Sequence, residues 1–305
     1  MWIIKNRIIF YVISVILLVG SLGAVATWGL ELGIDFKGGS LLEVTYPSGR
    51  PDIATVEARL AAAEGELKLG AYVMRPIGTN DISIKSRLLS ETDRATLSAV
   101  LSDNGALQTE VKRFTSVGPL IGAEAKKNAF WSISLVVLCI ILYITFVFRK
   151  VSRPVASWKY GVTAIVALAH DVIIPTGVFA FLGHYLGYEV DALFVTALLV
   201  ILGFSIHDTI VVFDRVRENL RRANSLKTSE DFEKVVGESV GQTVVRSINT
   251  SLTTIIALAI LYVFGAEATK HFSLTLMIGI AIGTYSSIFI ASALLVTLER
   301  LQKKN

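Results

Sequence analysis

The sequence has little that binds metals or nucleotides: of its 305 residues, one is cysteine and four are histidine. The single cysteine, Cys139, excludes an intrachain disulfide framework and a cluster of thiolate ligands. The histidines show no H-E-x-x-H or other paired spacing, so we expect no metal site. The sequence has no G-x-x-x-x-G-K-[ST] motif that would bind ATP at a P-loop. These absences predict a protein that is not an enzyme and has no cofactor.

Charged residues are also scarce, at 18%, while hydrophobic residues make up 53% and the mean hydropathy is +0.61. An ordinary soluble domain is about 25% charged. A run of about 20 apolar residues is long enough to cross the ~30 Å hydrocarbon core of a bilayer. The chain has six such runs, at 8–30, 129–148, 161–183, 192–213, 247–265 and 272–297. The sequence therefore predicts a polytopic α-helical membrane protein with six transmembrane helices.

Basic residues predict how these helices are oriented. Lysines and arginines precede the first run, follow the last, and gather between runs two and three and between runs four and five. The connection 184–191 has none, and 266–271 has only Lys270. Because basic loops stay in the cytoplasm, we expect both termini inside. The first run resembles a signal peptide, but it is longer than a usual h-region, and we expect it to be retained as a helix.

This topology divides the chain into four parts. We expect residues 1–30 to form the cytoplasmic N-terminus and first helix, and 31–128 to form an extracytoplasmic domain. Residues 129–297 would form helices two to six with a cytoplasmic loop at 214–246, and 298–305 a cytoplasmic tail.

The extracytoplasmic domain is predicted from alternating strand and helix patterns. Strands are expected at 40–46, 68–77, from 82 onward, and at 107–114. Helices are expected at 51–63, opened by a proline, and at 90–103, capped by Ser90 to Asp93. The order βαββαβ is the ferredoxin-like α+β pattern, which hosts many unrelated functions. We expect a binding or coupling module.

Two aspartates within the apolar runs are candidate functional groups, because a charge near the bilayer centre costs at least ~2.5 kcal/mol. Asp208 lies in the fourth run beside His207, and Asp171 follows His170 in the third. We expect Asp208 to carry protons or relay charge. The alternatives are a static pair with Arg246 or a position near the cytoplasmic end. Asp171 is equally well explained by hydrogen bonds to threonines or to backbone freed by Pro175.

Polar and small residues mark two further helix faces and one junction. Arg246 begins a stripe on the fifth run that continues through Asn249, Thr250, Thr253 and Thr254, and this stripe must face helices or water. Arg246 itself could also reach the lipid headgroups. On the sixth run, small residues recur at Gly279, Gly283, Ser287 and Ala291, forming either permanent packing or a partner interface. After the first run, Gly33, Asp35, Gly38 and Gly39 indicate tight backbone.

These segments carry a family resemblance. Residues 33–39 resemble the G-[IL]-D-F-x-G-G signature of the SecF family of protein-export subunits, related to resistance-nodulation-division transporters. Residues 169–171 and 203–219, the fifth-run segment from Arg246, and the sixth run are similar to family segments in the same order. His207 stands where the family commonly has asparagine.

The resemblance implies a bacterial inner-membrane protein that pairs with a six-helix SecD-like subunit and the SecY-SecE-SecG channel. It would assist a translocating polypeptide with the proton motive force, and Asp208 and Arg246 would serve proton passage. Membrane lipids surround such a protein, and we expect no nucleic acid. Two alternatives stay open. One is a scaffold that transduces no energy, and the other is a proton-driven exporter of small molecules or lipids. Such exporters usually have twelve spans.

Overall fold

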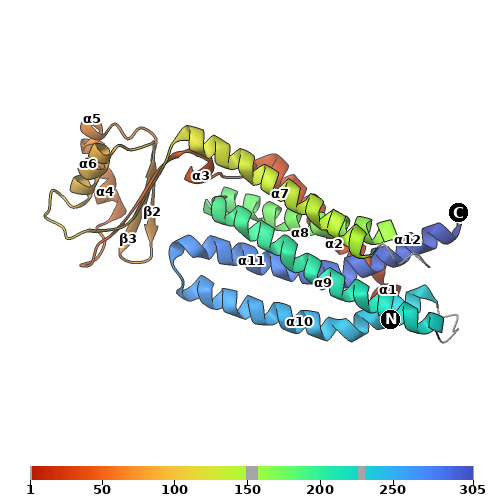
Figure 1. Ribbon diagram of the computed structural model, residues 1–305. Helices are drawn as coiled ribbons and strands as arrows, with labels where there is room; N and C mark the ends of the chain where they lie inside the picture. Colours follow the sequence, from red (N-terminus) through yellow and green to blue (C-terminus); the bar gives the residue numbers. More distant parts are fainter. Residues whose placement is uncertain (1, 149–156, 226–230, 305) are drawn as a thin grey trace. The chain divides into compact units, whose positions relative to one another are not determined.

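The computed structural model describes residues 2–148, 157–225 and 231–304, and the chain divides into two compact units. Met1–Glu31 and Phe130–Asn305 form the helical unit, and Leu32–Ala129 form the α+β unit (Figure 1).

The helical unit contains six helices long and apolar enough to cross a membrane, which confirms the predicted number. Figure 1 shows both chain ends at the same end of this bundle, as an even number of crossings requires. Its elements are α1 (Trp2–Lys5), α2 (Arg7–Trp28), α7 (Pro119–Val147) from Phe130 onward, α8 (Ser157–Leu186), α9 (Ala192–Ser225), α10 (Phe232–Phe264), α11 (Glu267–Tyr285), the π-helix η1 (Ser286–Ala291) and α12 (Ser292–Lys304). The last three run on without a break, and the sixth span is Thr269–Leu301.

Several helices continue beyond the predicted apolar runs. Helix α7 begins at Pro119 rather than at 129, through a polar stretch that includes Lys126 and Lys127. Within the segment expected as a loop, 214–246, the described residues 214–225 and 232–246 are helical. Ion pairs three residues apart support this extension of α9, with 3.5 Å between Arg217 and Asp214. Hydropathy detects only the part of a helix that meets lipid, so it missed these turns.

Helices α8, α9 and the sixth span supply most of the buried core of the helical unit, whereas α2, α7 and α10 are mostly exposed. Close contacts hold the bundle together. A Cβ on Gly177 of α8 would lie 2.2 Å from Cβ of Ser21 on α2, so only glycine fits there. At the end that carries the chain termini, Glu233 on α10 pairs with Arg7 at 3.6 Å and with Arg300.

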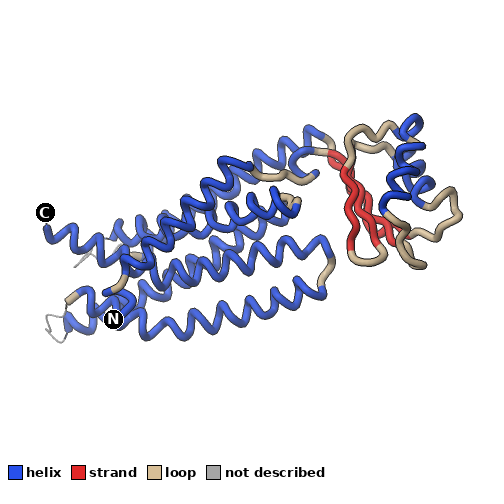
Figure 2. Tube along the Cα trace, turned by 180° about the vertical axis from the view of Figure 1, so that it is seen from behind, coloured by secondary structure: helices blue, strands red, loops and turns tan. Residues whose placement is uncertain are grey.

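The α+β unit contains a four-stranded antiparallel sheet in the order β2-β3-β1-β4. Its elements are α3 (Ile34–Lys37), β1 (Gly39–Thr45), α4 (Ile53–Ala62), α5 (Glu64–Leu67), β2 (Val73–Ile77), β3 (Asp81–Ser86), α6 (Glu91–Leu101) and β4 (Glu110–Val117). Figures 1 and 2 show α4, α5 and α6 on one face of the sheet. This is the predicted ferredoxin-like βαββαβ fold.

Two strand boundaries differ from the sequence prediction. The strand expected at 68–77 begins only at Val73, because residues 64–67 form the short helix α5 and Lys68 ends it with a left-handed φ of 44°. The strand expected at 107–114 occupies Glu110–Val117 instead. Asp103 and Asn104 both have positive φ, so the chain turns after α6 before it extends again.

The core of the α+β unit follows the period of two expected for a half-buried sheet. Leu42, Val44, Ile82 and Ile84 pack in one hydrophobic cluster with residues of the helices such as Leu97. Leu97 is fully buried, and replacing such a leucine with alanine typically costs about 2–5 kcal/mol. The unit therefore has a core of its own.

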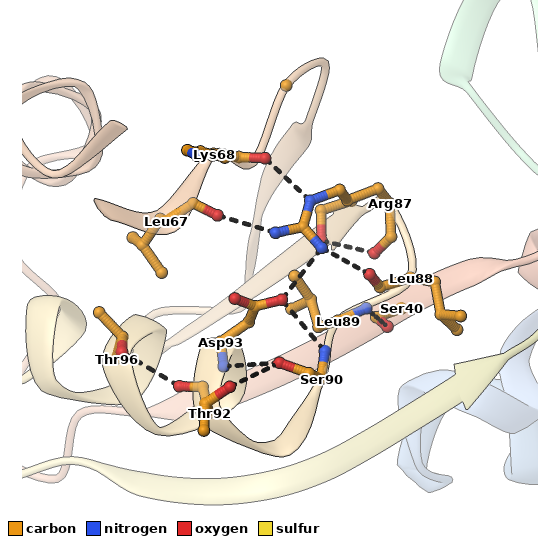
Figure 3. Close-up of polar contacts among 12 residues, drawn as sticks. Ser40, Leu67, Lys68, Arg87, Leu88, Leu89, Ser90, Thr92, Asp93 and Thr96 are labelled. Atoms are coloured by element: carbon orange, nitrogen blue, oxygen red, sulfur yellow. Dashed lines mark hydrogen bonds and ion pairs between the residues drawn. The ribbon is translucent and has the colours of Figure 1, made fainter. Parts of the chain in front are cut away.

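Arg87 connects two helices of this unit (Figure 3). Its guanidinium donates to the carbonyls of Leu67 at 2.9 Å and Lys68 at 2.8 Å, and to the carboxylate of Asp93 at 3.0 Å. Asp93 and Ser90 form the predicted capping box at the start of α6. The hydrogen bond from the backbone N–H of Ser90 holds the pKa of Asp93 below its usual value, and the hydrogen bond from Arg87 lowers it further by a smaller amount.

Candidate functional site

Asp171 lies at the centre of a polar cluster inside the helical unit. It is on α8, fully buried, and surrounded by donors from three elements. Nδ1 of the adjacent His170 lies 2.9 Å from Oδ1. The hydroxyls of Ser205 on α9 and Ser286 on η1 both donate to Oδ2, the latter at 2.7 Å. Because each oxygen has a donor, this carboxyl is well compensated and holds three elements together.

Asp208 is in a different situation. It lies on α9 with 4% of its surface exposed, and Oδ1 accepts one hydrogen bond, 3.1 Å long, from Ser247 on α10. Oδ2 is buried and has no hydrogen-bond partner in the described part of the chain. A buried charge normally needs a counter-charge or several hydrogen bonds. Asp208 is therefore an incompletely satisfied carboxyl within the bundle core.

Arg246, the expected partner of Asp208, precedes Ser247 on α10. Its side chain is exposed, and within the described residues no ion pair joins it to Asp208. Successive residues on a helix point about 100° apart, so Ser247 faces α9 while Arg246 lies on another face. The static Asp208–Arg246 pair considered from the sequence is thus not formed in this conformation.

The polar residues of α10 form two stripes rather than one. The outer stripe is the expected one: Arg246, Asn249, Thr250 and Thr253 are exposed on this chain, and Thr254 is half-buried. The inner stripe is buried and consists of Thr243, Ser247 and Ser251. Ser247 contacts Asp208, and Ser251 hydrogen-bonds Thr284 of α11. Sequence periodicity detected the outer stripe and missed the inner one.

The threonines of the outer stripe are hydrogen-bonded to their own helix. Thr250 donates to the carbonyl of Arg246, and Thr253 to that of Thr250, each at 2.9 Å. On α9, His207 and Gly203 are also exposed, and a Cβ on Gly203 would meet nothing within 4 Å among the described residues. In Figures 1 and 2, α10 lies at the edge of the bundle beside α9 and α11. The α9–α10 face, defined by Gly203, His207 and the outer stripe, is thus left uncovered by the described residues of this chain.

The small residues of the sixth span pack against α9 of the same chain. A Cβ on Gly279 would lie 2.0 Å from Cδ1 of Ile201, and one on Gly283 would lie 3.1 Å from Cβ of Ser205. Ser287 donates to the carbonyl of Ser205 at 3.3 Å and lies 2.8 Å from the hydroxyl of Thr209. These residues therefore serve helix packing within the chain.

The π-helix η1 (Ser286–Ala291) lies where these contacts converge. Ser286, Ser287 and Ala291 are fully buried in it. A π-helix widens the turn by one residue and is often found at functional sites. Here it places two consecutive serines toward two groups of α8 and α9, since Ser286 reaches Asp171 and Ser287 reaches Thr209.

The junction motif is a tight backbone crossing within the α+β unit. Gly33 precedes α3, Asp35 lies in its first turn, and Gly38 ends it with φ of 78°. Gly39 begins β1 with φ of 123°, and a Cβ there would lie 2.6 Å from the carbonyl oxygen of Ser86. A Cβ on Gly38 would lie 3.0 Å from Cα of Pro119. The last two glycines are thus required by close backbone contacts.

Comparison with known proteins places these features in a family. Residues 96–301 match the family model of the protein export membrane protein SecD/SecF, C-terminal. Residues 23–46, which include the junction motif, match the SecD/SecF GG motif.

Named relatives match this chain along nearly its whole length. The chain is 42% identical to the protein translocase subunit SecF of Thermobaculum terrenum over 304 residues, covering 97% of this chain and 93% of that protein. It is 38% identical to the subunit of the same name from Anaerolinea thermophila, covering 99% and 96% respectively.

A solved structure shows the same fold. The crystal structure of SecDF from Thermus thermophilus, described as a translocon-associated membrane protein, superposes with a TM-score of 0.81 at 30% identity. The match covers 97% of this chain but only 38% of the SecDF chain, so the present chain corresponds to under half of that protein. The chain has six helices long and apolar enough to span a membrane, a ferredoxin-like unit, and relatives named protein translocase subunit SecF that match nearly its whole length. It therefore belongs to the SecF family of protein translocase subunits.

Proposed function

We propose that this chain pairs with a six-helix SecD-type subunit and uses the proton motive force to help polypeptides pass through a SecY-SecE-SecG channel. The relatives are named protein translocase subunits, and the Thermus SecDF is described as translocon-associated. That SecDF chain has room for a second part of similar size, since this chain covers 38% of it. The role is one of transport, with no covalent chemistry assigned to the chain.

The uncovered α9–α10 face supports a partner within the membrane. Arg246 and Asn249 are exposed there, and lipid is a poor environment for an arginine and an amide. Gly203 leaves room for close approach by another helix. A SecD-type helix that covers this face would satisfy the polar groups and exclude lipid.

The observation that carries the proton role is Asp208, a buried carboxyl with one unsatisfied oxygen between α9 and α10. When protonated, it can donate from Oδ2 to a partner group that approaches along the α9–α10 face. When ionised, it attracts Arg246, which lies next to its hydrogen-bond donor Ser247. A charge moved through 100 mV supplies about 2.3 kcal/mol, enough to bias two packings of similar energy.

The proposed topology orients the bundle so that protons would enter from the side of the exported domain. Both termini and the α9–α10 connection would be cytoplasmic, and residues 31–128 would lie outside the bacterial inner membrane. Helices α2 and α7 lead into and out of that domain. Shifts in the bundle would therefore move the exported domain, which could hold an emerging polypeptide and oppose its return.

The test compares Asp208→Asn with Asp214→Asn in a strain lacking its own SecF-type subunit. Asp214 is on the same helix and exposed, so it controls for loss of a carboxylate from α9. Both variants should insert and co-purify with the SecD-type subunit. Only Asp208→Asn should lose the part of export that disappears when the proton gradient is collapsed at constant ATP. Full proton-dependent export by Asp208→Asn would refute the proposal.

One observation favours a scaffold as the second candidate. Both carboxyl oxygens of Asp171 have hydrogen-bond partners, as expected of a group that only fixes helix packing. If the whole bundle is static, deletion of the chain would slow export, but collapse of the gradient would have the same effect with and without it.

A further inference from the structure

Four rings meet where the turn between α8 and α9 reaches the start of α11. The imidazole of His271 on α11 stacks on the ring of Tyr188 in that turn, with centroids 4.2 Å apart and planes at 24°. Phe179 of α8 lies beside both, at 6.3 Å and 6.4 Å, and contacts Phe194 of α9 at 4.7 Å with the two ring planes tilted by 49°. This aromatic cluster attaches the turn to the sixth span.

The turn is held in one conformation. Gly187 ends α8 with φ of 66°, a left-handed value that favours glycine. At the other end, Asp191 accepts a hydrogen bond from the backbone N–H of Phe194 at 2.8 Å, which caps α9. We call residues 187–191 the coupling turn. Because both of its ends are fixed, we expect a displacement of Tyr188 to move the whole turn.

The coupling turn also holds the segment that leaves the first helix. The N–H of Val190 donates to the carbonyl of Glu31 at 2.7 Å. Gly183 of α8 lies against both the coupling turn and Glu31, since a Cβ there would lie 3.0 Å from the carbonyl oxygen of Tyr188 and 3.5 Å from Cβ of Glu31. Helix α2 has already ended at Gly29, which has φ of 71°. The position of Glu31 is therefore determined by the coupling turn as well as by α2.

On its other side, the aromatic cluster is continuous with the polar core. From His271 to Ser286 the sixth span is unbroken helix, about 22 Å at 1.5 Å per residue. Ser286 is the residue of η1 that donates to Asp171, and Gly283 lies against Ser205 on the way. Because this helix is continuous, a shift of the sixth span at the polar core also moves His271.

From these contacts we infer that the coupling turn links the sixth span mechanically to the segment Gly29–Glu31, which leads into the α+β unit, with His271 as the positioning residue. The use of this link in export rests on the proposed function; the link itself does not. A movement at η1 would reach the entrance of the α+β unit through a helix, one ring stack and one backbone hydrogen bond.

Hydrogen–deuterium exchange on the purified full chain with its SecD-type partner tests the link without any transport. His271→Ala should speed exchange across 187–191, including the Val190 amide that donates to Glu31, about three- to tenfold, the factor that an aromatic pair contributes. His271→Phe keeps a ring in place and should restore protection. Lys270→Ala is the matched control, because its ion pair with Glu267 stays within α11 at 2.6 Å.

A second arm tests transmission from the core. Ser286→Ala removes a hydrogen bond to Asp171 and should change exchange of the Val190 amide, which donates to Glu31, in the wild-type background but not together with His271→Ala. Unchanged exchange of the Val190 amide in His271→Ala, or equal effects of Ser286→Ala in both backgrounds, would overturn the inference. The proposed function fails by a different measurement, full proton-dependent export by Asp208→Asn, so the two failures are distinguishable.

Discussion

Replacing Gly39 with alanine tests whether the junction motif is a steric requirement. Gly39 has φ of 123°, and a left-handed backbone costs an L-residue with a side chain about 1–2 kcal/mol. The added Cβ would also lie 2.6 Å from the carbonyl oxygen of Ser86, whereas ordinary contacts begin near 3.4 Å. Strands β1 and β3 would have to separate by about 0.8 Å at the pair Ser40–Ser86. Forcing an atom into packed structure typically costs a further ~1–3 kcal/mol.

The sum, about 2–5 kcal/mol, is a large part of the stability of a small domain. We therefore expect Gly39→Ala to unfold the α+β unit at clearly lower denaturant concentration, measured by pulse proteolysis of the full chain in detergent. Gly49→Ala is the control, because Gly49 also has positive φ, 103°, but meets no atom within 4 Å among the described residues. It should lose only about 1–2 kcal/mol. Equal losses in the two variants would show that the contact with Ser86 imposes no constraint.

Two further predictions concern helix packing and pH. Gly177→Ala should force α2 and α8 apart, since its Cβ would lie 2.3 Å from Cα of Ser21, and should lower thermal stability in detergent by about 1–3 kcal/mol; Gly20→Ala, with open space at its Cβ among the described residues, should not. Because the pKa of Asp93 is lowered in the folded state, its contribution to stability is present above the usual aspartate pKa and is lost as the pH falls through the lowered value. Urea midpoints of the α+β unit measured from pH 6 to pH 2.5 should therefore fall at the acid end, and less steeply in Asp93→Asn; identical slopes would contradict this reasoning.

Much of the architecture could be predicted because its signals are strong and local. Apolar runs identify the six spans, and the capping box at Ser90 and the alternation of β1 and β3 identify the ferredoxin-like unit. The ends of helices that continue beyond the apolar runs were harder to predict, because the polar turns of α7, α9 and α10 have no hydropathy signal. Lys68 and Asp103 have a left-handed backbone conformation, so the strands after them begin later than their side-chain pattern predicted.

The candidate site was only partly predictable, for a physical reason. A lone acid in an apolar run is recognisable, so Asp171 and Asp208 were found. How well each is satisfied depends on serines contributed by other helices, and serine is too common to stand out in sequence. The two polar stripes of α10 show the same limit, because periodicity cannot tell which face packs within the chain. The π-helix η1 has no sequence signature comparable to a cap or a proline.

That wide turn lets the last part of the chain tolerate a change of length at one place. Residues 286–291 accommodate one more amino acid than a regular helix of the same rise would. Deleting a single residue there would restore a regular helix and leave Ala293, Leu295 and Val296, all fully buried now, in the core. The same deletion within the regular helix α12 would rotate everything beyond it by about 100°. A one-residue gap would therefore be less harmful in η1 than in the helix that follows it.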